Sequence, residues 1–267
     1  MAPLKRRLLP FAYWASTWAM RLLLRTFARW EVVGADRVPQ SGPIIFVSNH
    51  VHIIDPPLVA ASAHRRVHPM AKRELFEVPL IGWWFWLWGA FPVRRFSGDM
   101  GALRVARNYL RNSEVVLMFP EGTRSRGAGM RAALPGAAMV AVLAKSPIVP
   151  VAITGSRIRI PAVFWQWALR RRPHIRVEFG EPFVMEGHRA DSKGAEAATD
   201  AIMRRIAAML PEDYRGAYGA GSEGTIVVAR VRDRNANEAE VDASSAAAQA
   251  AEAAEAAEDA EGARAEE

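Results

Sequence analysis

The chain contains no cysteine among its 267 residues. This absence excludes disulfide scaffolds, thiolate metal sites, iron–sulfur clusters and a cysteine nucleophile. Lysine is scarce, with only four residues, so nearly all of the positive charge is arginine. Two apolar runs stand out, thirteen uncharged residues from Leu8 to Met20 and sixteen from Val78 to Val93. Both are shorter than the ~20 residues that a membrane-spanning helix needs.

The charge is divided unevenly along the chain. Residues 235–267 contain ten Asp or Glu and one Arg, a net charge of −9. Because the whole chain has a net charge of +7, residues 1–234 carry +16. This Ala/Glu-rich segment has no aromatic residue, Ile, Leu or Met and cannot bury a core. We therefore expect residues 216–267 to form a linker and a disordered acidic tail.

Residues 1–234, with their high positive charge, should lie near phosphates on nucleic acid, a membrane surface or a phosphorylated substrate. Nine tryptophans against four tyrosines favour a bilayer interface. Residues 1–30 predict a membrane-associating amphipathic helix, with Arg21, Arg25 and Arg29 on one face meeting anionic headgroups. A first helix packed on the core, with solvated arginines, is the alternative.

Short β-branched runs alternate with helical patterns from residue 31 onward, which predicts an α/β domain over residues 31–215. Its central sheet is expected to be mixed but largely parallel, flanked by helices, with functional residues at the carboxyl ends of strands. The predicted strands are Ile44–Ser48, Val115–Phe119, Ile148–Ile153 and Ile175–Phe179. The predicted helices are Pro56–His64, Asp99–Asn112, Pro135–Lys145 and Lys193–Leu210.

The first polar cluster follows the predicted strand Ile44–Ser48, and it contains His50 and Asp55. At a strand-to-helix junction this spacing can bring the imidazole and the carboxylate together. Asp55 would then orient His50, whose other ring nitrogen could take a proton from a substrate hydroxyl. Alone, the pair is equally compatible with a structural histidine.

The second polar cluster follows the predicted strand Val115–Phe119. It combines a carboxylate, a glycine-containing turn, two hydroxyls and an arginine, in the order Glu121, Gly122, Thr123, Arg124 and Ser125. Arginine can hold phosphate in a bidentate manner, and backbone near a glycine can approach a ligand closely. The cluster therefore suits a phosphorylated polyol.

Together with two further blocks, these clusters resemble the glycerolipid acyltransferase family, in particular its bacterial 1-acylglycerol-3-phosphate O-acyltransferases. The order and spacing agree over residues 31–185, about 60% of the chain. The blocks are Asn49-His50 with Asp55, Lys72–Leu75 through Pro79 and Gly82 to Gly89–Arg95, Phe119–Ser125, and Ile148–Ile153.

The resemblance implies that His50 is the general base, that Asp55 orients it, and that no acyl-enzyme forms. It implies that the acceptor phosphate is bound by Arg95, Glu121, Gly122, Thr123 and Arg124. The acyl donor would be acyl-CoA or acyl-carrier protein and the acceptor lysophosphatidate, with phosphatidate as product and no cofactor or metal. The implied location is the cytoplasmic face of the cell membrane, as a peripheral or monotopic protein, with no nucleic-acid partner.

Two positions depart from the family pattern. His52 stands where a serine is common and could compete for Asp55 or bind a metal, and Arg94 lies beside Arg95, which leaves open which arginine faces the site. Other acceptors of the family (glycerol 3-phosphate, other lysophospholipids, lyso-aminolipids) stay open. So do a metal-dependent phosphoester hydrolase using His50, His52 and Asp55, and a non-enzymatic basic membrane-binding protein.

Overall fold

The computed structural model describes residues 2–95, 97–125, 129–158, 167, 171–187 and 191–222. The chain divides into two units, residues 1–229 and 230–267, and every described residue belongs to the first. Of the predicted linker and acidic tail, residues 216–267, the part from residue 223 onward lies outside the described residues, whereas residues 216–222 belong to the described unit, where Tyr218 is buried.

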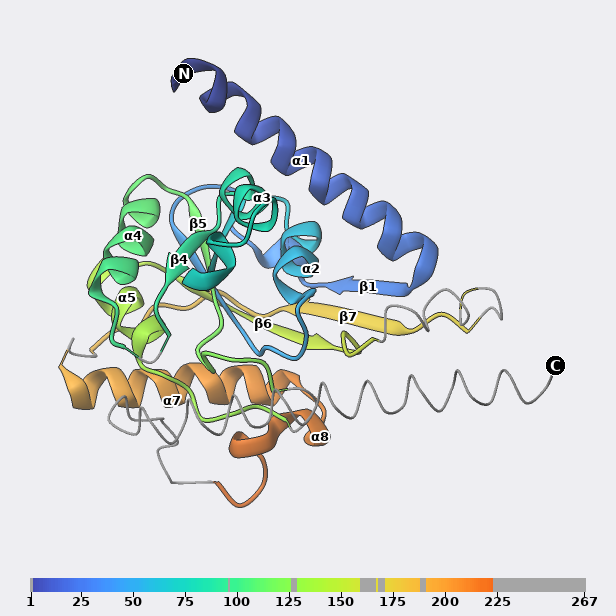
Figure 1. Ribbon diagram of the computed structural model, residues 1–267. Helices are drawn as coiled ribbons and strands as arrows, with labels where there is room; N and C mark the ends of the chain where they lie inside the picture. Colours follow the sequence, from blue (N-terminus) through green and yellow to red (C-terminus); the bar gives the residue numbers. More distant parts are fainter. Residues whose placement is uncertain are drawn as a thin grey trace. The chain divides into compact units, whose positions relative to one another are not determined.

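A seven-stranded sheet forms the centre of the described unit (Figure 1), in the order β1-β7-β6-β2-β5-β3-β4. Only the β6–β7 pair is antiparallel among the strand pairs of the described residues. The strands are β1 (Arg29–Val33), β2 (Ile44–Ser48), β3 (Val67–Lys72), β4 (Phe91–Val93), β5 (Val115–Met118), β6 (Ile148–Thr154) and β7 (His174–Phe179). The prediction of a mixed, largely parallel sheet is confirmed.

The middle of the sheet is buried on both faces. Strand β2 lies between β5 and β6, with Ile45 opposite both Val116 and Ile148. Every residue of β2 and β5 is buried, as is all of β6 except Thr154. A run that is apolar on both faces is typical of a parallel strand covered by helices on each side.

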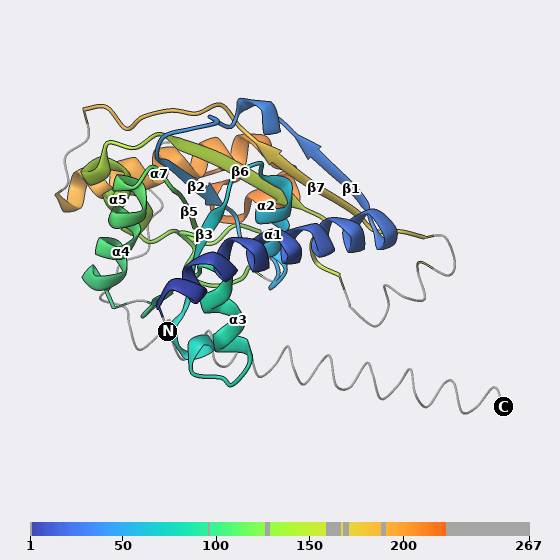
Figure 2. The same cartoon turned by 90° about the horizontal axis from the view of Figure 1, so that it is seen from above.

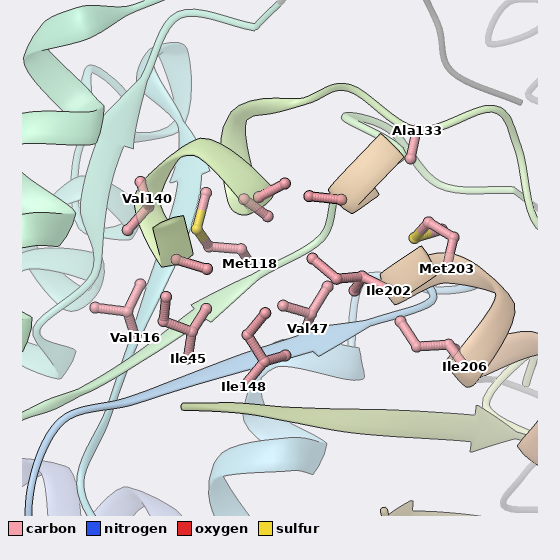
Figure 3. Packing of buried hydrophobic residues seen from close by; sticks show 14 of the residues in the cluster. Ile45, Val47, Val116, Met118, Ala133, Val140, Ile148, Ile202, Met203 and Ile206 are labelled. Atoms are coloured by element: carbon pink, nitrogen blue, oxygen red, sulfur yellow. The ribbon is translucent and has the colours of Figure 1, made fainter. Parts of the chain in front are cut away.

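Helices cover both faces of the sheet (Figures 1 and 2). Side chains of α4, α5 and α7 pack against one face, where Ile202 and Ile206 meet Val47 and Ile148 (Figure 3). Helices α1 and α2 cover the other face. The helices are α1 (Ala2–Phe27), α2 (Asp55–Ser62), α3 (Ile81–Trp88), α4 (Met100–Arg111), α5 (Gly136–Ala144), α7 (Ser192–Met209) and α8 (Glu212–Arg215), with 3₁₀ turns η1 (Ala35–Arg37), η2 (Arg73–Phe76) and η3 (Gly216–Tyr218).

The four predicted strands and four predicted helices are present, with ends shifted by one or two residues. Strands β1, β3 and β4 and the short helices α3 and α8 were not predicted. Strand β3 mixes His68, Pro69 and Lys72 with apolar residues and β4 is only three residues long, so neither segment has the β-branched run that predicted the other strands. The uncharged stretch Val78–Val93 contains helix α3 and strand β4.

The N-terminal helix is present as α1, but its faces differ from the prediction. Arg21 donates from Nε and one terminal nitrogen to the carbonyl oxygens of Ala61 and Ala63, at 2.7 and 3.0 Å. The expectation that Arg21 meets headgroups is therefore wrong, because the free carbonyls at the end of α2 attract the guanidinium. The exposed residues of α1 include the apolar Phe11, Trp14, Trp18, Leu22 and Leu23, and Arg25 is exposed on the same helix, as predicted.

Candidate active site

His50 and Asp55 lie close together at the carboxyl end of β2, as the sequence predicted. The distance from His50 Nδ1 to Asp55 Oδ2 is 2.9 Å. Asp55 is the first residue of α2 and is followed by two prolines, whose missing N–H groups are harmless in the first helical turn. The imidazole stacks on the ring of Phe119, with centroids 4.2 Å apart. Both side chains are therefore fixed by the fold.

The Asp55 carboxylate organises the loop around His50. Its Oδ2 also accepts the backbone N–H groups of Val51 at 2.7 Å and His52 at 2.8 Å. An ionised carboxylate only accepts hydrogen bonds, so Nδ1 of His50 carries its proton and Nε2 keeps a lone pair. His52 thus reaches Asp55 through its backbone N–H, while His50 uses its ring.

The second polar cluster fixes the backbone of His50. Glu121 Oε1 accepts the His50 N–H at 2.8 Å, and the Ser125 N–H donates to the His50 carbonyl at 2.7 Å. Gly122 closes the turn between these contacts with a φ of 68°, a conformation that glycine adopts without strain. Two clusters seventy residues apart in the sequence are therefore parts of one site.

Glu121 is only 2% exposed, and both of its oxygens are occupied. Its Oε2 accepts the N–H of Arg131 at 2.9 Å. Burial raises the pKa of Glu121 to about 8, and the charge of Asp55 adds to this, whereas the N–H groups of Arg131 and His50 lower it. The carboxyl group thus links the His50 loop to the segment that begins at Gly129.

The raised pKa of Glu121 predicts a pH-dependent stability. Between the ordinary value of 4.5 and about 8, the folded chain holds a proton that the unfolded chain has released, so stability falls as pH rises through this range. Glu121→Gln cannot ionise, so we expect it to lose less stability than the parent, by up to about 1.4 kcal/mol per pH unit. Urea unfolding at several pH values within this range measures the difference.

Equal pH dependence of the parent and Glu121→Gln would contradict this prediction. Glu181→Gln is the control for the loss of one negative charge, because Glu181 is exposed and pairs with Arg37.

Two arginines converge beside this site. Arg95, just beyond β4, is half-buried, whereas Arg94 is exposed. Burial and the positive charge of Arg124 lower the pKa of Arg95, while Glu74 opposes this. The positive charges of Arg95 and Arg124 repel each other, and a bound anion would reduce this repulsion. The structure therefore distinguishes the two neighbouring arginines, because Arg95 is the one beside Arg124.

Thr123 is buried in the same loop, and Asn49 joins this loop region to the next strand. The Asn49 side-chain amide exchanges two hydrogen bonds with the backbone of Ile153, at 2.8 and 2.9 Å. The sequence motif includes Asn49 but does not predict its contact with β6. Its position directly after a buried strand was the available signal.

Within the described ranges, no group of three or more His, Asp or Glu side chains is arranged to hold a metal ion. None of the helices in the described part of the chain is both long and apolar enough to cross a membrane.

The site thus combines a buried His/Asp pair with neighbouring arginines at the carboxyl edge of a largely parallel sheet, the edge at which α/β folds place their functional residues. Residues 29–154 match the protein-family model described as Acyltransferase. His50, Asp55, Arg95 and Arg124 lie inside the matched residues.

Several curated relatives are named 1-acyl-sn-glycerol-3-phosphate acyltransferase. The one from Streptococcus pneumoniae is 31% identical over 171 residues, which is 62% of this chain and 61% of the relative. The human alpha form is 37% identical over 129 residues, 47% of this chain and 46% of its own length. The chain thus spans about half to three fifths of these relatives.

The crystal structure of the 1-acyl-sn-glycerophosphate acyltransferase PlsC from Thermotoga maritima has a similar fold. The TM-score is 0.51 at 23% sequence identity, covering 76% of this chain and 78% of that one.

Proposed function

We propose that this protein transfers a fatty acyl group from an acyl thioester to the free hydroxyl of lysophosphatidate, giving phosphatidate. The observation that carries the proposal is the fixed His50: Asp55 holds its ring, and Glu121 and Ser125 hold its backbone. A histidine oriented in this way is suited to take a proton from a hydroxyl group. The names of the relatives support the acceptor.

The chemistry needs no enzyme nucleophile. Nε2 of His50 takes the proton of the acceptor hydroxyl while the oxygen attacks the thioester carbonyl carbon. The carbon–sulfur bond then breaks, and the leaving thiolate takes the proton back from the imidazolium. Asp55 stabilises the positive charge on the imidazole between these two events. Atoms and charge balance with an ester and a free thiol as products.

The arginine pair supports a phosphorylated acceptor. A phosphate monoester carries close to two negative charges at neutral pH and offers several acceptor oxygens. Arg95 and Arg124 can divide these charges between them. Glu121 cannot share this role directly, because both of its oxygens accept backbone N–H groups. We therefore propose that Glu121 positions His50, and that Arg95 and Arg124 bind the phosphate.

The test is thiol release from palmitoyl-CoA and from palmitoyl-carrier protein, with and without lysophosphatidate, with product analysis. We expect lysophosphatidate-dependent release and formation of phosphatidate. Glycerol 3-phosphate and lysophosphatidylcholine are the comparison acceptors, and faster transfer to either would replace the proposed acceptor. Release that needs no acceptor would indicate a thioester hydrolase and refute the proposal.

Exposed aromatic residues support a membrane surface as the place of reaction. On α3, Trp83 and Trp86 are 65% and 57% exposed, whereas Trp88 is buried against Tyr13. Helix α1 lies beside α3 (Figure 2). Its side chains Phe11, Trp14, Trp18, Leu22 and Leu23 are exposed. Tryptophan is enriched where protein meets lipid headgroups. We propose that this surface of α1 and α3 lies on the cytoplasmic leaflet.

Trp83→Ser/Trp86→Ser is expected to weaken binding to phosphatidylglycerol-containing vesicles by at least about tenfold, because burying one large side chain is worth roughly 1.5–3 kcal/mol. Co-sedimentation with vesicles measures the effect. The control is Met100→Ser/Leu143→Ser, which removes two exposed apolar side chains from α4 and α5 on the other face of the sheet. Equal loss in both double variants would contradict the proposed surface.

A further inference from the structure

Three side chains that carry hydrogen-bond donors gather at the amino end of β3, where α1 and α3 lie side by side. The guanidinium carbon of Arg66 lies 5.5 Å from the ring centroid of Tyr13, and the ring centroid of Trp88 lies 5.8 Å from it. The Tyr13 hydroxyl accepts the N–H of Val67, the first residue of β3, at 2.9 Å. Tyr13 therefore joins a cation from the sheet to an indole from α3.

The donors of this group outnumber its acceptors. Nε of Arg66 and Nε1 of Trp88 are buried, and neither has a hydrogen-bond partner in the part of the chain that the structure describes. The neighbouring acceptors, the Gly89 carbonyl and the Glu114 carboxylate, both face ring nitrogens of His68, at 2.9 and 2.5 Å. A buried donor without an acceptor destabilises a fold, so a ligand that supplies acceptor oxygens would be favoured here.

The charges around Tyr13 favour an anionic ligand. Burial raises the pKa of Tyr13 to about 12, whereas the Val67 N–H and the positive charges of Arg66 and Arg21 oppose this increase. Tyr13 therefore keeps its proton at neutral pH. Arg66 is half-buried and forms no ion pair with any carboxylate that the structure describes. A phosphodiester group has a negative charge and only acceptor oxygens, so it suits both the charge and the unused donors.

This group lies at the opposite edge of the sheet from His50. Val67 begins β3, so Arg66 is at the amino edge of the parallel strands, whereas Arg95 follows β4 at the carboxyl edge. The six residues of β3 separate the two edges by about 20 Å, at about 3.3 Å for each residue. A phosphate bound at Arg66 is therefore distinct from the acceptor phosphate proposed at Arg95.

Partly exposed aromatic side chains flank the group. Trp14 of α1 packs edge-on against Tyr13 and is 41% exposed. Trp84 of α3 stacks on Trp88, with ring centroids 5.2 Å apart, and is 38% exposed. A phospholipid carries apolar chains that can contact such rings, and free phosphate does not. The surroundings thus favour a lipid headgroup as the source of the phosphate.

We propose that Arg66 and the indole N–H of Trp88 bind the phosphate of a membrane phospholipid where α1 and α3 lie side by side. Rotation of the partly exposed rings of Trp14 or Trp84 gives the phosphate access to the two buried nitrogens. The choice of a lipid rests on the proposed membrane surface, whereas the binding itself does not depend on acyl transfer. The bound lipid anchors both helices to the bilayer.

Co-sedimentation with two kinds of vesicle tests the site. Phosphatidylcholine and digalactosyldiacylglycerol both form bilayers without net charge, but only the first contains phosphate. Arg66→Ala is expected to weaken binding to phosphatidylcholine about tenfold or more, the effect of a lost hydrogen bond from a charged group, and to leave binding to the galactolipid unchanged. Trp88→Phe keeps an aromatic ring but removes the N–H, so it should weaken phosphatidylcholine binding about two- to tenfold. Equal loss on both lipids, or no loss on phosphatidylcholine, would overturn the site.

Arg107→Ala is the matched control, because Arg107 is an exposed arginine of α4, which covers the other face of the sheet. It should bind both lipids as the parent does. Arg66 makes no hydrogen bond to the described residues, so Arg66→Ala is expected to fold and tests the site even if Trp88→Phe unfolds.

Calorimetric titration with inorganic phosphate distinguishes the two sources of the group. We expect no saturable binding at millimolar concentration, because the free ion lacks the apolar chains. Saturable binding by the parent that is lost in Arg66→Ala would assign the site to the free ion and overturn the lipid.

Two results separate this inference from the proposed function. Trp83→Ser/Trp86→Ser should weaken binding to both lipids alike, because it removes apolar contacts only. If that variant binds as the parent does while Arg66→Ala loses phosphatidylcholine alone, the proposed surface fails and the phosphate site stands. With the acceptor in detergent, Arg66→Ala should have the KM of the parent for lysophosphatidate. A raised KM would show that Arg66 serves the acceptor and would overturn a separate site.

Discussion

His50→Ala is expected to lower kcat for lysophosphatidate acylation by about 10²–10⁴-fold, the usual contribution of a positioned general base. The reason is that no other described side chain has both the imidazole and the buried carboxylate partner seen at His50 and Asp55. Thiol release from palmitoyl-CoA with saturating lysophosphatidate measures the loss. Since the donor and acceptor sites remain intact, both KM values should change little.

His64→Ala is the matched control for this experiment. His64 is an exposed histidine just beyond α2 and is not part of the site, so the variant should retain full activity. Asp55→Asn provides a second check, because an amide in place of the carboxylate disturbs the tautomer of His50 and should lower kcat with a changed pH profile. Activity that survives in His50→Ala would eliminate His50 as the base.

Arg124→Ala is expected to raise the KM for lysophosphatidate by about ten- to a hundredfold, because a hydrogen bond to a charged group contributes roughly 1.5–3 kcal/mol. The donor KM should change far less. Arg95→Ala should behave in the same way, since Arg95 is electrostatically coupled to Arg124. Initial rates over a grid of donor and acceptor concentrations separate the two KM values.

Arg94→Ala is the control for the arginine pair, because it removes the same charge from the neighbouring, exposed position. Monoacylglycerol provides a chemical control, since it lacks the phosphate and should react equally slowly with the parent and with Arg124→Ala. Equal increases in donor and acceptor KM in Arg124→Ala would show that Arg124 does not bind the acceptor phosphate.

The buried strands and the paired clusters could be predicted because their signals are local. The runs of β2, β5 and β6 are apolar except at the last residues of β2 and β6, as is typical of strands covered on both faces. The five-residue spacing of His50 and Asp55 lies within one strand-to-helix junction, so sequence neighbours are also neighbours in space. Strands β3 and β4 lacked such signals, because β3 mixes polar with apolar residues and β4 is only three residues long.

Arg21 and Glu121 show where local patterns were insufficient. A helical projection places Arg21 with other arginines, but it does not reveal the carbonyl groups of α2 that bind it. The motif places Glu121 beside phosphate-binding residues, but both oxygens accept backbone N–H groups, one of them seventy-one residues away. Each outcome depends on a hydrogen-bond partner that is distant in the sequence.

By itself, then, the sequence determined the α/β class, the order of the main strands and helices, and which residues are proposed to carry the chemistry, since periodicity and motif spacing are properties of short segments. Only the tertiary structure decided that Arg95 rather than Arg94 lies beside Arg124, and that Glu121 and Ser125 hold the backbone of His50. Such relations depend on which strands become neighbours in the sheet, and that is settled by packing between segments far apart in the chain.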